Sequence, residues 1–396
     1  MSASIDHFEV ACVNALSRSK AFCTQFGFSL FAVNLDGAVM QYACKAGESI
    51  FVFSQRPEDC VLSGDTVFDC ALSVDKVAAV FNRALKAGAT NIKKPMELHD
   101  ENGNGSVTMA IIGSPIGNVV HTLINRENYK GIFLPGFTPP DITTLAQFPA
   151  STYKIKTTHI DHVTYVVERG TSPKMIEFYG NALGCERFRV NLNEDDETGM
   201  PVNVGSVEMR LMAAEYWRCA ESGVRIHNLD SDKQSVTFVM VEAIWGKETG
   251  SGNQIATYLE NHGGPGIQHI ALHTNNIVES TRAMRQAGCV FPHIPQGYYT
   301  KIGKSDEIER VGECLEELKK LGILLDAEGE FSYDGEIKTK DRYLMQAFTA
   351  PIFQKNTFFM EVISRFGACG FGAGNITALW DAMEAVHQER TSTNSS

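Results

Sequence analysis

The sequence predicts an α+β protein built from repeated βαβββ modules that form two open-barrel domains. The stretch SIDHFEVACVNALSRSKAFCTQFGFSLF at residues 4–31 is echoed at 159–189 by HIDHVTYVVERGTSPKMIEFYGNALGCERFR. Each copy reads as an Ile-Asp-His start, an apolar strand, a polar turn, an amphipathic helix that ends near glycine, and a further strand. Such an echo at wide spacing is typical of a duplicated supersecondary unit.

Two further echoes complete the pattern, at residues 266–291 and, more weakly, at 67–92. Repeats spaced this widely exceed the short units of a solenoid and indicate duplicated modules. Four modules would make two domains of two modules each. Residues 128–154 are punctuated by proline and glycine, which favours a linker between the halves. We therefore expect an N-terminal domain at 1–145 and a C-terminal domain at 155–396.

The C-terminal half carries additional elements. Residues 304–326 have the apolar spacing of one amphipathic helix, with glutamate and lysine interleaved on the exposed face. The polar stretch 327–343 favours a hairpin. Residues 375–390 predict a last helix, which we expect to act as a lid because flanking glycines allow hinging.

Composition excludes several classes of protein. Of the 396 residues, 43% are hydrophobic and 21% are charged, which is typical of a globular protein in water. The net charge of −12 argues against nucleic-acid binding. No apolar run is long enough for a transmembrane segment. Ten cysteines without CxxC spacing favour reduced thiols in the cytosol over disulfides or a zinc site.

Two histidines and a glutamate stand out in apolar strands. Alternation in HIDHVTYVV puts His162 on one face together with Ile160, and alternation in GIQHIALHT groups His269 with Ile267. Glu361 lies among phenylalanine, methionine and aliphatic residues in TFFMEVISR. A carboxylate buried there without a partner would cost several kcal/mol, so it needs a cation.

That cation has two possible sources. An arginine, Arg210 or Arg365, could pair with Glu361, and a metal ion is the sharper alternative. His162, His269 and Glu361 together would form a facial triad with three open coordination positions, which suits non-haem Fe(II) and oxygen chemistry. The competing interpretation is that each histidine is an ordinary hydrogen-bonded core residue.

Three motifs carry a resemblance to a known family. The segments IDHV, GGPGIQHIAL and FFMEVISRFGACGFGAGN resemble, in this order, the metal-ligand segments of the 4-hydroxyphenylpyruvate dioxygenase family, in the vicinal-oxygen-chelate superfamily. The resemblance implies that His162, His269 and Glu361 bind Fe(II), with 4-hydroxyphenylpyruvate, a 2-oxo acid, and dioxygen as substrates. The first half has His7 in an equivalent Ile-Asp-His but no comparable carboxylate strand, so we expect it to keep only the fold.

The expected substrate pocket departs from the family pattern. Leu211 stands where family members have a serine, and their Pro-x-Asn strand reads Val239, Met240, Val241 here. Ile376 replaces an aromatic residue after FGAGN. The substrate contacts that remain by this resemblance are three amides and three aromatic rings: Gln254, Gln268, Gln346, Phe348, Phe359 and Phe371. With GYYTKIGK and GNITALW, the pattern looks closer to the dioxygenase-like branch of this family in animals.

That branch implies a different product from the enzyme of tyrosine breakdown. It implies hydroxylation of the benzylic carbon to 4-hydroxymandelate, on a route to the ubiquinone headgroup, instead of homogentisate formation. We expect the loss of polar pocket residues to let the benzylic carbon approach the iron. The alternatives are a homogentisate-forming enzyme, an enzyme for another 2-oxo acid, and a non-catalytic scaffold.

The sequence also gives expectations for the location of the protein in the cell and for its assembly. The N-terminus has neither a secretory signal nor an Arg-rich transit peptide, which predicts a cytoplasmic protein. The resembled branch suggests association with mitochondria as an alternative. The expected partners are a small-molecule 2-oxo acid and dioxygen, and a homodimer is a candidate assembly.

Overall fold

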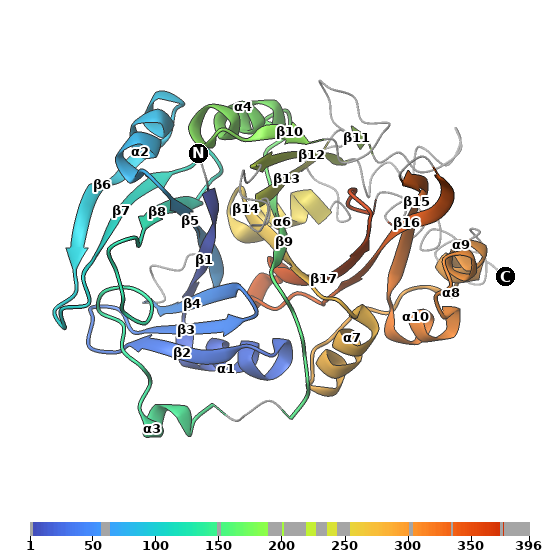
Figure 1. The fold of residues 1–396 in the computed structure, drawn as a ribbon, viewed down its shortest axis with the longest axis horizontal. Coiled ribbons are helices and arrows are strands. Elements are labelled where there is room, and N and C mark those ends of the chain that lie inside the picture. The colour runs from blue at the N-terminus through green and yellow to red at the C-terminus, as the bar shows by residue number, and fades with distance from the viewer. Residues whose placement is uncertain are drawn as a thin grey trace.

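Two mixed β-sheets with helices around them form the molecule (Figure 1). The structure is a computed structural model and describes residues 3–56, 64–148, 152–188, 200–201, 219–226, 236–243, 254–300, 304–333, 336–372 and 375. Strands and helices share the chain in the way that the sequence predicts, so the α+β class is confirmed. None of the described helices is long and apolar enough to cross a lipid bilayer.

The first sheet has eight strands in the order β2-β3-β4-β1-β5-β8-β7-β6. Its strands are β1 (Ala3–Cys12), β2 (Ser29–Asn34), β3 (Gln41–Ala46), β4 (Ser49–Gln55), β5 (Thr66–Val74), β6 (Thr90–His99), β7 (Ser106–Gly113) and β8 (Val120–Asn125). Its helices are α1 (Ala15–Phe26) and α2 (Val77–Lys86), and α3 (Ile142–Leu145) follows the sheet.

The second sheet has nine strands, eight of them in the order β10-β12-β13-β9-β14-β17-β16-β15, with β11 paired to β12. Its strands are β9 (Ile160–Val166), β10 (Glu186–Phe188), β11 (Met200–Pro201), β12 (Cys219–Ile226), β13 (Val236–Ala243), β14 (Gly266–His273), β15 (Leu324–Tyr333), β16 (Glu336–Phe348) and β17 (Phe359–Phe366). The helical elements of this half are α4 (Ser172–Leu183), α6 (Gln254–His262), α7 (Ile277–Gln286), α8 (Gln296–Thr300), α9 (Lys304–Arg310), α10 (Leu315–Leu321) and the 3₁₀ turn Gln354–Asn356.

The two sheets repeat one another strand for strand. In the first sheet β1 pairs in parallel with β4 and antiparallel with β5, and β9 does the same with β13 and β14 in the second. The parallel pair β5–β8 likewise corresponds to β14–β17. The helix after each first strand ends at a glycine in the left-handed region, Gly27 (φ 75°) and Gly184 (φ 74°). The predicted module duplication is therefore confirmed.

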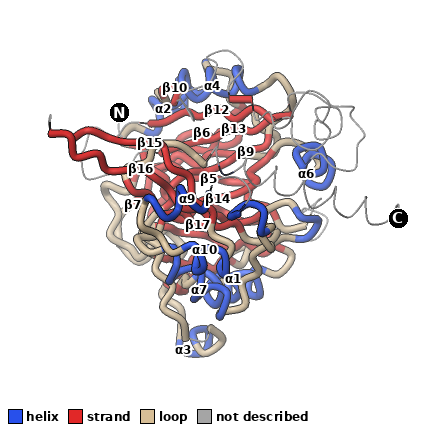
Figure 2. The backbone as a smooth tube through the Cα atoms, turned by 90° about the vertical axis from the view of Figure 1, so that its right-hand side faces the viewer, coloured by secondary structure: helices blue, strands red, loops and turns tan. Residues whose placement is uncertain are grey.

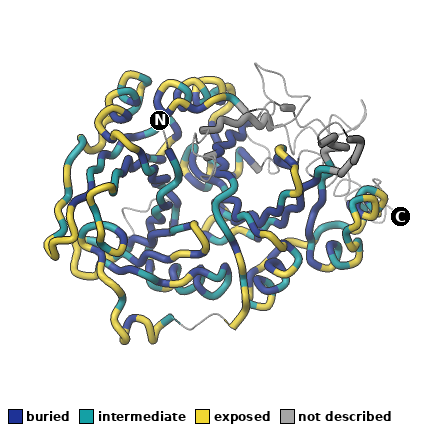
Figure 3. Tube along the Cα trace, in the orientation of Figure 1, coloured by how far each residue is buried: buried dark blue, intermediate teal, exposed yellow. Residues whose placement is uncertain are grey.

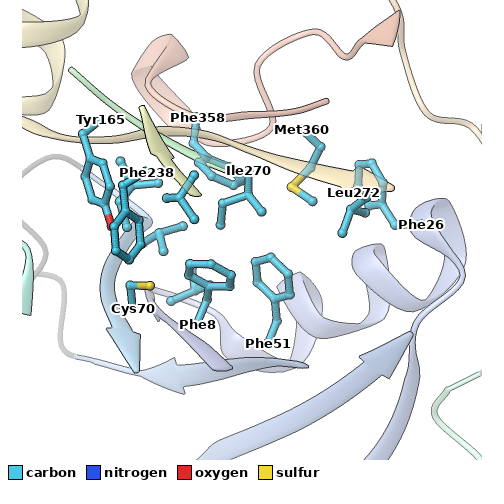
Figure 4. Packing of buried hydrophobic residues seen from close by; sticks show 14 of the residues in the cluster. Phe8, Phe26, Phe51, Cys70, Tyr165, Phe238, Ile270, Leu272, Phe358 and Met360 are labelled. Carbon is cyan, nitrogen blue, oxygen red and sulfur yellow. The ribbon is translucent and has the colours of Figure 1, made fainter. Parts of the chain in front are cut away.

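One apolar core lies between the two sheets. Phe8 and Phe51 from the first sheet face side chains of the second half, among them Ile270 and Phe358 (Figure 4), and all of them belong to a single buried cluster. The strands of both sheets are mostly buried, whereas helices and loops at the periphery are exposed (Figure 3). Because neighbouring residues of a strand point to opposite faces, the apolar side chains that enter this core turn their strand neighbours toward the other face of the sheet.

The three elements predicted for the C-terminal half have different outcomes in the structure. The predicted single helix at 304–326 is wrong, because α9 and α10 are separate helices and strand β15 already begins at Leu324. Gly312, between the helices, has φ 84°, which ends a right-handed helix. The predicted hairpin is present as β15–β16 and projects from the body of the molecule (Figure 2). Of the predicted last helix, only Asn375 lies within the described residues.

The segment predicted as a linker is partly packed against the first half. Val33 and Thr138 exchange two backbone hydrogen bonds of 2.9 and 2.8 Å. Phe133 and Phe137 are buried against residues of the first sheet. The interpretation of the whole of 128–154 as a linker is therefore wrong for its first part, whereas the domain boundaries themselves stay a prediction. The eight cysteines whose side chains the structure describes are free thiols.

Candidate metal centre

Two imidazoles and one carboxylate from three strands converge in the second half. Nε2 of His162 lies 3.3 Å from Oε2 of Glu361, and Nε2 of His269 lies 3.5 Å from the same oxygen. The three possible ligand atoms all lie within 4.8 Å of one another. Among the described residues, this is the one group of three or more His, Cys, Asp or Glu side chains with that spacing. The structure thus brings together the three residues that the sequence singled out.

The register of three neighbouring strands explains the convergence. Ala271 on β14 lies opposite His162 on β9 and opposite Glu361 on β17. His269 precedes Ala271 by two residues and therefore shares its face. The three donors surround Ala271, whose methyl group leaves the space between them open.

A β-bulge precedes each histidine, so the side chains there do not alternate between the two faces of the sheet as in a regular strand. The pairing of β9 with β14 shifts between Ala271 and Leu272, so that Ile160 pairs with Leu272 on the core side and Asp161 is the extra residue. A second shift makes Gln268 an extra residue, and Ile267 enters the core. The predictions that Ile160 and Ile267 share a face with the histidines are therefore wrong.

The first bulge lets Asp161 hold His162. Nδ1 of His162 donates to Oδ1 of Asp161 at 2.7 Å, and Arg365 donates to both oxygens of Asp161 at 2.6 and 2.7 Å. Burial would raise the pKa of Asp161, but the Arg365 guanidinium outweighs burial and holds this pKa below its usual range. A carboxylate on Nδ1 fixes the ring so that Nε2 faces the other two donors.

The second bulge gives His269 a comparable support from an amide. Its Nδ1 donates to Oε1 of Gln268 at 3.1 Å, and its ring stacks on Phe359 with centroids 4.7 Å apart. Burial, and secondarily the positive charge of His162, lower the pKa of His269 well below its ordinary value. The ring is therefore neutral, with its Nε2 lone pair available as a ligand.

Glu361 is almost fully buried, with 1% of its surface exposed, and has no arginine partner among the described residues. Arg365 pairs with Asp161 instead, and Arg210 lies outside the described residues. Burial alone would lower the pKa of His162, but Glu361 and Asp161 outweigh it and raise this pKa to about 9. A proton on His162 thus compensates the Glu361 carboxylate, as a bound metal cation would do at the same place.

The arrangement fits a divalent metal ion with open coordination positions. Imidazole nitrogens bind first-row ions such as zinc at about 2.0–2.1 Å, so two donors at right angles stand about 3 Å apart. The separations of 3.3 and 3.5 Å from the Glu361 oxygen are close to this value. The two imidazole planes are inclined by 84°, which suits ligands on adjacent corners of an octahedron.

The predicted substrate contacts divide into three groups. Phe348, Phe359 and Phe371 lie around the histidines, with Phe371 at 4.7 Å from the His162 ring and Phe348 at 6.4 Å from the His269 ring. Gln346 is buried and bonds Glu361, and Gln268 bonds His269.

The remaining predicted contacts lie on the neighbouring strand β13 or beyond the described side chains. Val239 and Val241 are buried on β13, and Val239 lies opposite Thr164 of β9. Gln254 is the first residue of α6, but its side chain is outside the described part. Leu211 and Ile376 also lie outside the described residues. All of these contacts stay predictions.

The sequence did not reveal the role of Asp161, which binds the Arg365 that was one candidate partner for Glu361. The signal was available in the repeat, because the first half contains the same unit. His7 donates from Nδ1 to Asp6 at 2.6 Å, and Nε of Arg126 donates to Asp6 at 3.0 Å. An Ile-Asp-His shared by both halves therefore marks an aspartate–histidine pair.

The first half lacks the rest of the triad. At the positions of His269 and Glu361 it has Asp69 and Thr122, which are hydrogen-bonded to each other through the Thr122 N–H at 3.0 Å and through its hydroxyl. Burial raises the pKa of Asp69 to about 7. An aromatic cluster of Phe31, Phe133 and Phe137 packs on the same face of this sheet, with Phe133 against His7 at 5.2 Å.

Comparison with known proteins agrees with this geometry. Residues 159–305 match the Glyoxalase/Bleomycin resistance protein/Dioxygenase superfamily. The chain is 32% identical to the 4-hydroxyphenylpyruvate dioxygenase-like protein of Rattus norvegicus, over 91% of this chain and 90% of that protein. It is 30% identical to 4-hydroxyphenylpyruvate dioxygenase of Dictyostelium discoideum, over 97% of this chain and 98% of that protein.

A solved structure shares the fold. A triple mutant of 4-hydroxymandelate synthase from Streptomyces coelicolor matches with a TM-score of 0.69 and 24% identity, over 97% of this chain and 99% of that one. The resemblance seen in the sequence is confirmed by these relatives. The chain belongs to the 4-hydroxyphenylpyruvate dioxygenase family.

Proposed function

We propose that the protein is an Fe(II)-dependent dioxygenase that decarboxylates and hydroxylates 4-hydroxyphenylpyruvate. The observation that carries this proposal is the convergence of His162, His269 and Glu361, each held by a further hydrogen bond, with Oε2 of Glu361 facing both Nε2 atoms. A carboxylate with two imidazoles on one face leaves positions for a chelating 2-oxo acid and for dioxygen. Bound ferrous iron would supply the activation of dioxygen that oxidative decarboxylation requires.

The residues of the chain have separate tasks in this proposal. Asp161 and Gln268 hold the two histidines through Nδ1, so that each Nε2 stays directed at the metal position. The aromatic side chains Phe348, Phe359 and Phe371 surround the histidines and would contact the aromatic ring of the substrate. These rings also exclude water, which protects reactive species from side reactions.

We further propose that hydroxylation takes place at the benzylic carbon and gives 4-hydroxymandelate. The support is the apolar side expected for the pocket, where buried Val239 and Val241 stand at the positions of the proline and the asparagine of the family pattern. The side chains of Val239 and Val241 offer no hydrogen bond to the phenol group of 4-hydroxyphenylpyruvate, so on this side the substrate ring would be positioned by packing alone. A shift of about 1 Å in a reacting atom changes rates by orders of magnitude, and such a shift would select which carbon reacts.

The test is product analysis with purified, iron-loaded protein and 4-hydroxyphenylpyruvate, with oxygen uptake followed in parallel. We expect 4-hydroxymandelate together with one carbon dioxide for each dioxygen consumed. Homogentisate as the main product would contradict hydroxylation at the benzylic carbon but would agree with the proposed dioxygenase activity. Oxygen uptake with another 2-oxo acid and none with 4-hydroxyphenylpyruvate would contradict the proposed substrate.

The matched control is Glu361→Gln, which keeps the size of the side chain and removes its charge. We expect this variant to bind iron far more weakly and to consume no oxygen, because the triad loses its only anion. A wild-type protein that binds no iron and consumes no oxygen with any 2-oxo acid would support the non-catalytic scaffold instead.

We propose a place for this product in the synthesis of the ubiquinone headgroup, in a protein of the cytosol or associated with mitochondria. The resemblance to the animal branch supports this proposal, and a homodimer is the proposed assembly. Cells supplied with ring-labelled 4-hydroxyphenylpyruvate should no longer incorporate label into ubiquinone when the protein is removed. The same cells should incorporate label again when ring-labelled 4-hydroxymandelate is supplied instead.

A further inference from the structure

We propose that Tyr298 is a positioning residue for the carboxylate ligand and that it acts through Asn375 and Gln346. This inference rests on the proposed function, because it assumes that Glu361 binds iron. In the hydrogen bonds described below, Tyr298 and Asn375 reach Glu361 only through Gln346. Their effect on the metal centre would pass through hydrogen bonds alone.

An unbroken hydrogen-bonded chain joins the tyrosine to the glutamate. Nε2 of Gln346 donates to Oε1 of Glu361 at 2.8 Å, and Nδ2 of Asn375 donates to Oε1 of Gln346 at 3.0 Å. The Tyr298 hydroxyl donates to Oδ1 of Asn375 at 2.6 Å. All four side chains are at least 98% buried, so water cannot replace a lost partner without cost.

The direction of every bond in this chain is dictated by the carboxylate. Ionised Glu361 only accepts, so Gln346 must present its NH2 group, which also donates to the Phe371 carbonyl at 3.1 Å. Oε1 of Gln346 then faces Asn375, whose NH2 group must donate to it. Oδ1 of Asn375 therefore accepts the hydrogen bond of the Tyr298 hydroxyl. Every amide in the chain therefore has one allowed orientation.

The tyrosine itself is fixed by the main chain. Its hydroxyl oxygen accepts the N–H of Leu325 at 3.0 Å and lies 3.1 Å from the carbonyl of the same residue. Tyr298 lies on α8, and Leu325 lies in β15. The chain thus anchors the ligand to a helix and a strand that carry no ligand themselves.

The chain has a consequence for the coordination of the metal. Gln346 occupies Oε1 of Glu361, whereas Oε2 faces both histidines. A carboxylate held in this way offers one oxygen to the metal, and three positions stay open for substrates. If the chain is broken at Tyr298, Oδ1 of Asn375 loses its donor and the Asn375 amide is held less firmly. The hydrogen bond from Asn375 to Gln346 weakens as a result, so Gln346 holds Oε1 of Glu361 less rigidly.

The neighbouring tyrosine provides a matched control. Tyr299 is also fully buried on α8, and its hydroxyl bonds the carbonyl of Ile323 at 3.0 Å, but it has no link to the ligands among the described contacts. Tyr298→Phe and Tyr299→Phe each remove one buried hydroxyl from the same helix. A general loss of stability would therefore affect both variants alike, whereas only the first breaks the chain to Glu361.

The experiment measures iron binding and not turnover. The dissociation constant of Fe(II) is determined by anaerobic competition with a chelator, together with the melting temperature of each metal-free protein. We expect Tyr298→Phe to bind iron about tenfold more weakly than the wild type, at the lower end of the effect of residues that support metal ligands, and Tyr299→Phe to stay within about twofold. The electron paramagnetic resonance spectrum of the nitric-oxide-treated Fe(II) protein should change only for Tyr298→Phe.

A second variant guards against a folding failure. Asn375→Ala breaks the chain at its middle and should weaken iron binding at least as much as Tyr298→Phe. Equal iron affinity and equal spectra for the wild type and both tyrosine variants would overturn the inference, as would equal losses in both. A wild-type protein that binds no iron would overturn the proposed function itself, so the two failures are distinguishable.

Discussion

Asp161 determines how His162 can act, because it lies in a bulge and accepts from Nδ1 while Arg365 donates to both of its oxygens. This arrangement combines two effects on one imidazole. It fixes the position of the ring nitrogen that bears the hydrogen, and it makes the other nitrogen a better electron donor. At the scale of the residue, we therefore expect metal binding to depend on a side chain that is not itself one of the three candidate ligands.

Asp161→Asn tests this dependence. The amide keeps one accepting oxygen but places an NH2 group against the Arg365 guanidinium, so we expect iron binding to weaken about 10- to 100-fold. Asp6→Asn is the matched control, because Asp6 makes the same contacts with His7 and Arg126 in the half without a triad. Chelator competition on both variants gives the answer, and equal affinities in the two would contradict the assigned role.

At the scale of the element, the stretch after β8 behaves as part of the first half. Phe133 contacts His7, Phe31 and Phe137 with ring centroids 5.0–5.4 Å apart. The guanidinium of Arg126 lies over the same ring at 4.8 Å. These contacts occupy the face of the sheet that corresponds to the metal-binding face of the second half.

Phe133→Ala should lower the free energy of unfolding by about 3–5 kcal/mol, the usual cost of removing a buried aromatic ring. Iron affinity should not change, because the ligands lie in the other sheet. The control Ile142→Ala alters a side chain of the same stretch that is 84% exposed, and it should change stability by no more than about 0.5 kcal/mol. Chemical denaturation with iron binding measured in parallel checks both, and a similar small effect for the two variants would show that the ring is dispensable.

The sequence predicted elements well where one periodicity governs a whole segment. The duplicated modules and the β15–β16 hairpin follow from alternation and punctuation, and the ligands follow from polar residues that interrupt apolar strands. The errors at Ile160 and Ile267 arise because a bulge adds one residue and reverses the face. The chain from Tyr298 to Glu361 could not be predicted, because it depends on contacts between residues far apart in the sequence.

At the scale of the whole molecule, the halves share a buried polar contact as well as an apolar core. His121 on β8 bonds the Tyr179 hydroxyl on α4 at 2.9 Å and the Cys70 carbonyl at 2.8 Å. Burial lowers the pKa of His121 to about 4 from an ordinary value of 6.5. Between these two pH values the unfolded chain binds a proton at His121, whereas the folded protein does not. The free energy of unfolding therefore decreases as the pH falls from 6.5 towards 4.

His121→Gln removes this titration and keeps one donor and one acceptor. The wild type should lose up to about 3 kcal/mol across this window through His121, and the variant should show a correspondingly shallower pH dependence. His99→Gln, at a histidine whose side chain is 75% exposed, should leave the slope unchanged. Urea denaturation at several pH values measures the three slopes, and identical slopes would exclude His121 as the cause.

The aspartate and arginine around His7 show that the support of an imidazole does not depend on a metal-binding triad. In the first half Phe133 packs against His7, and Asp6 still accepts from both His7 and Arg126. Asp6 lies where the pairing of β1 with β5 shifts, so this salt bridge also fastens an irregular point of the strand. The same unit thus serves as architecture in one half and as the frame of a candidate metal centre in the other.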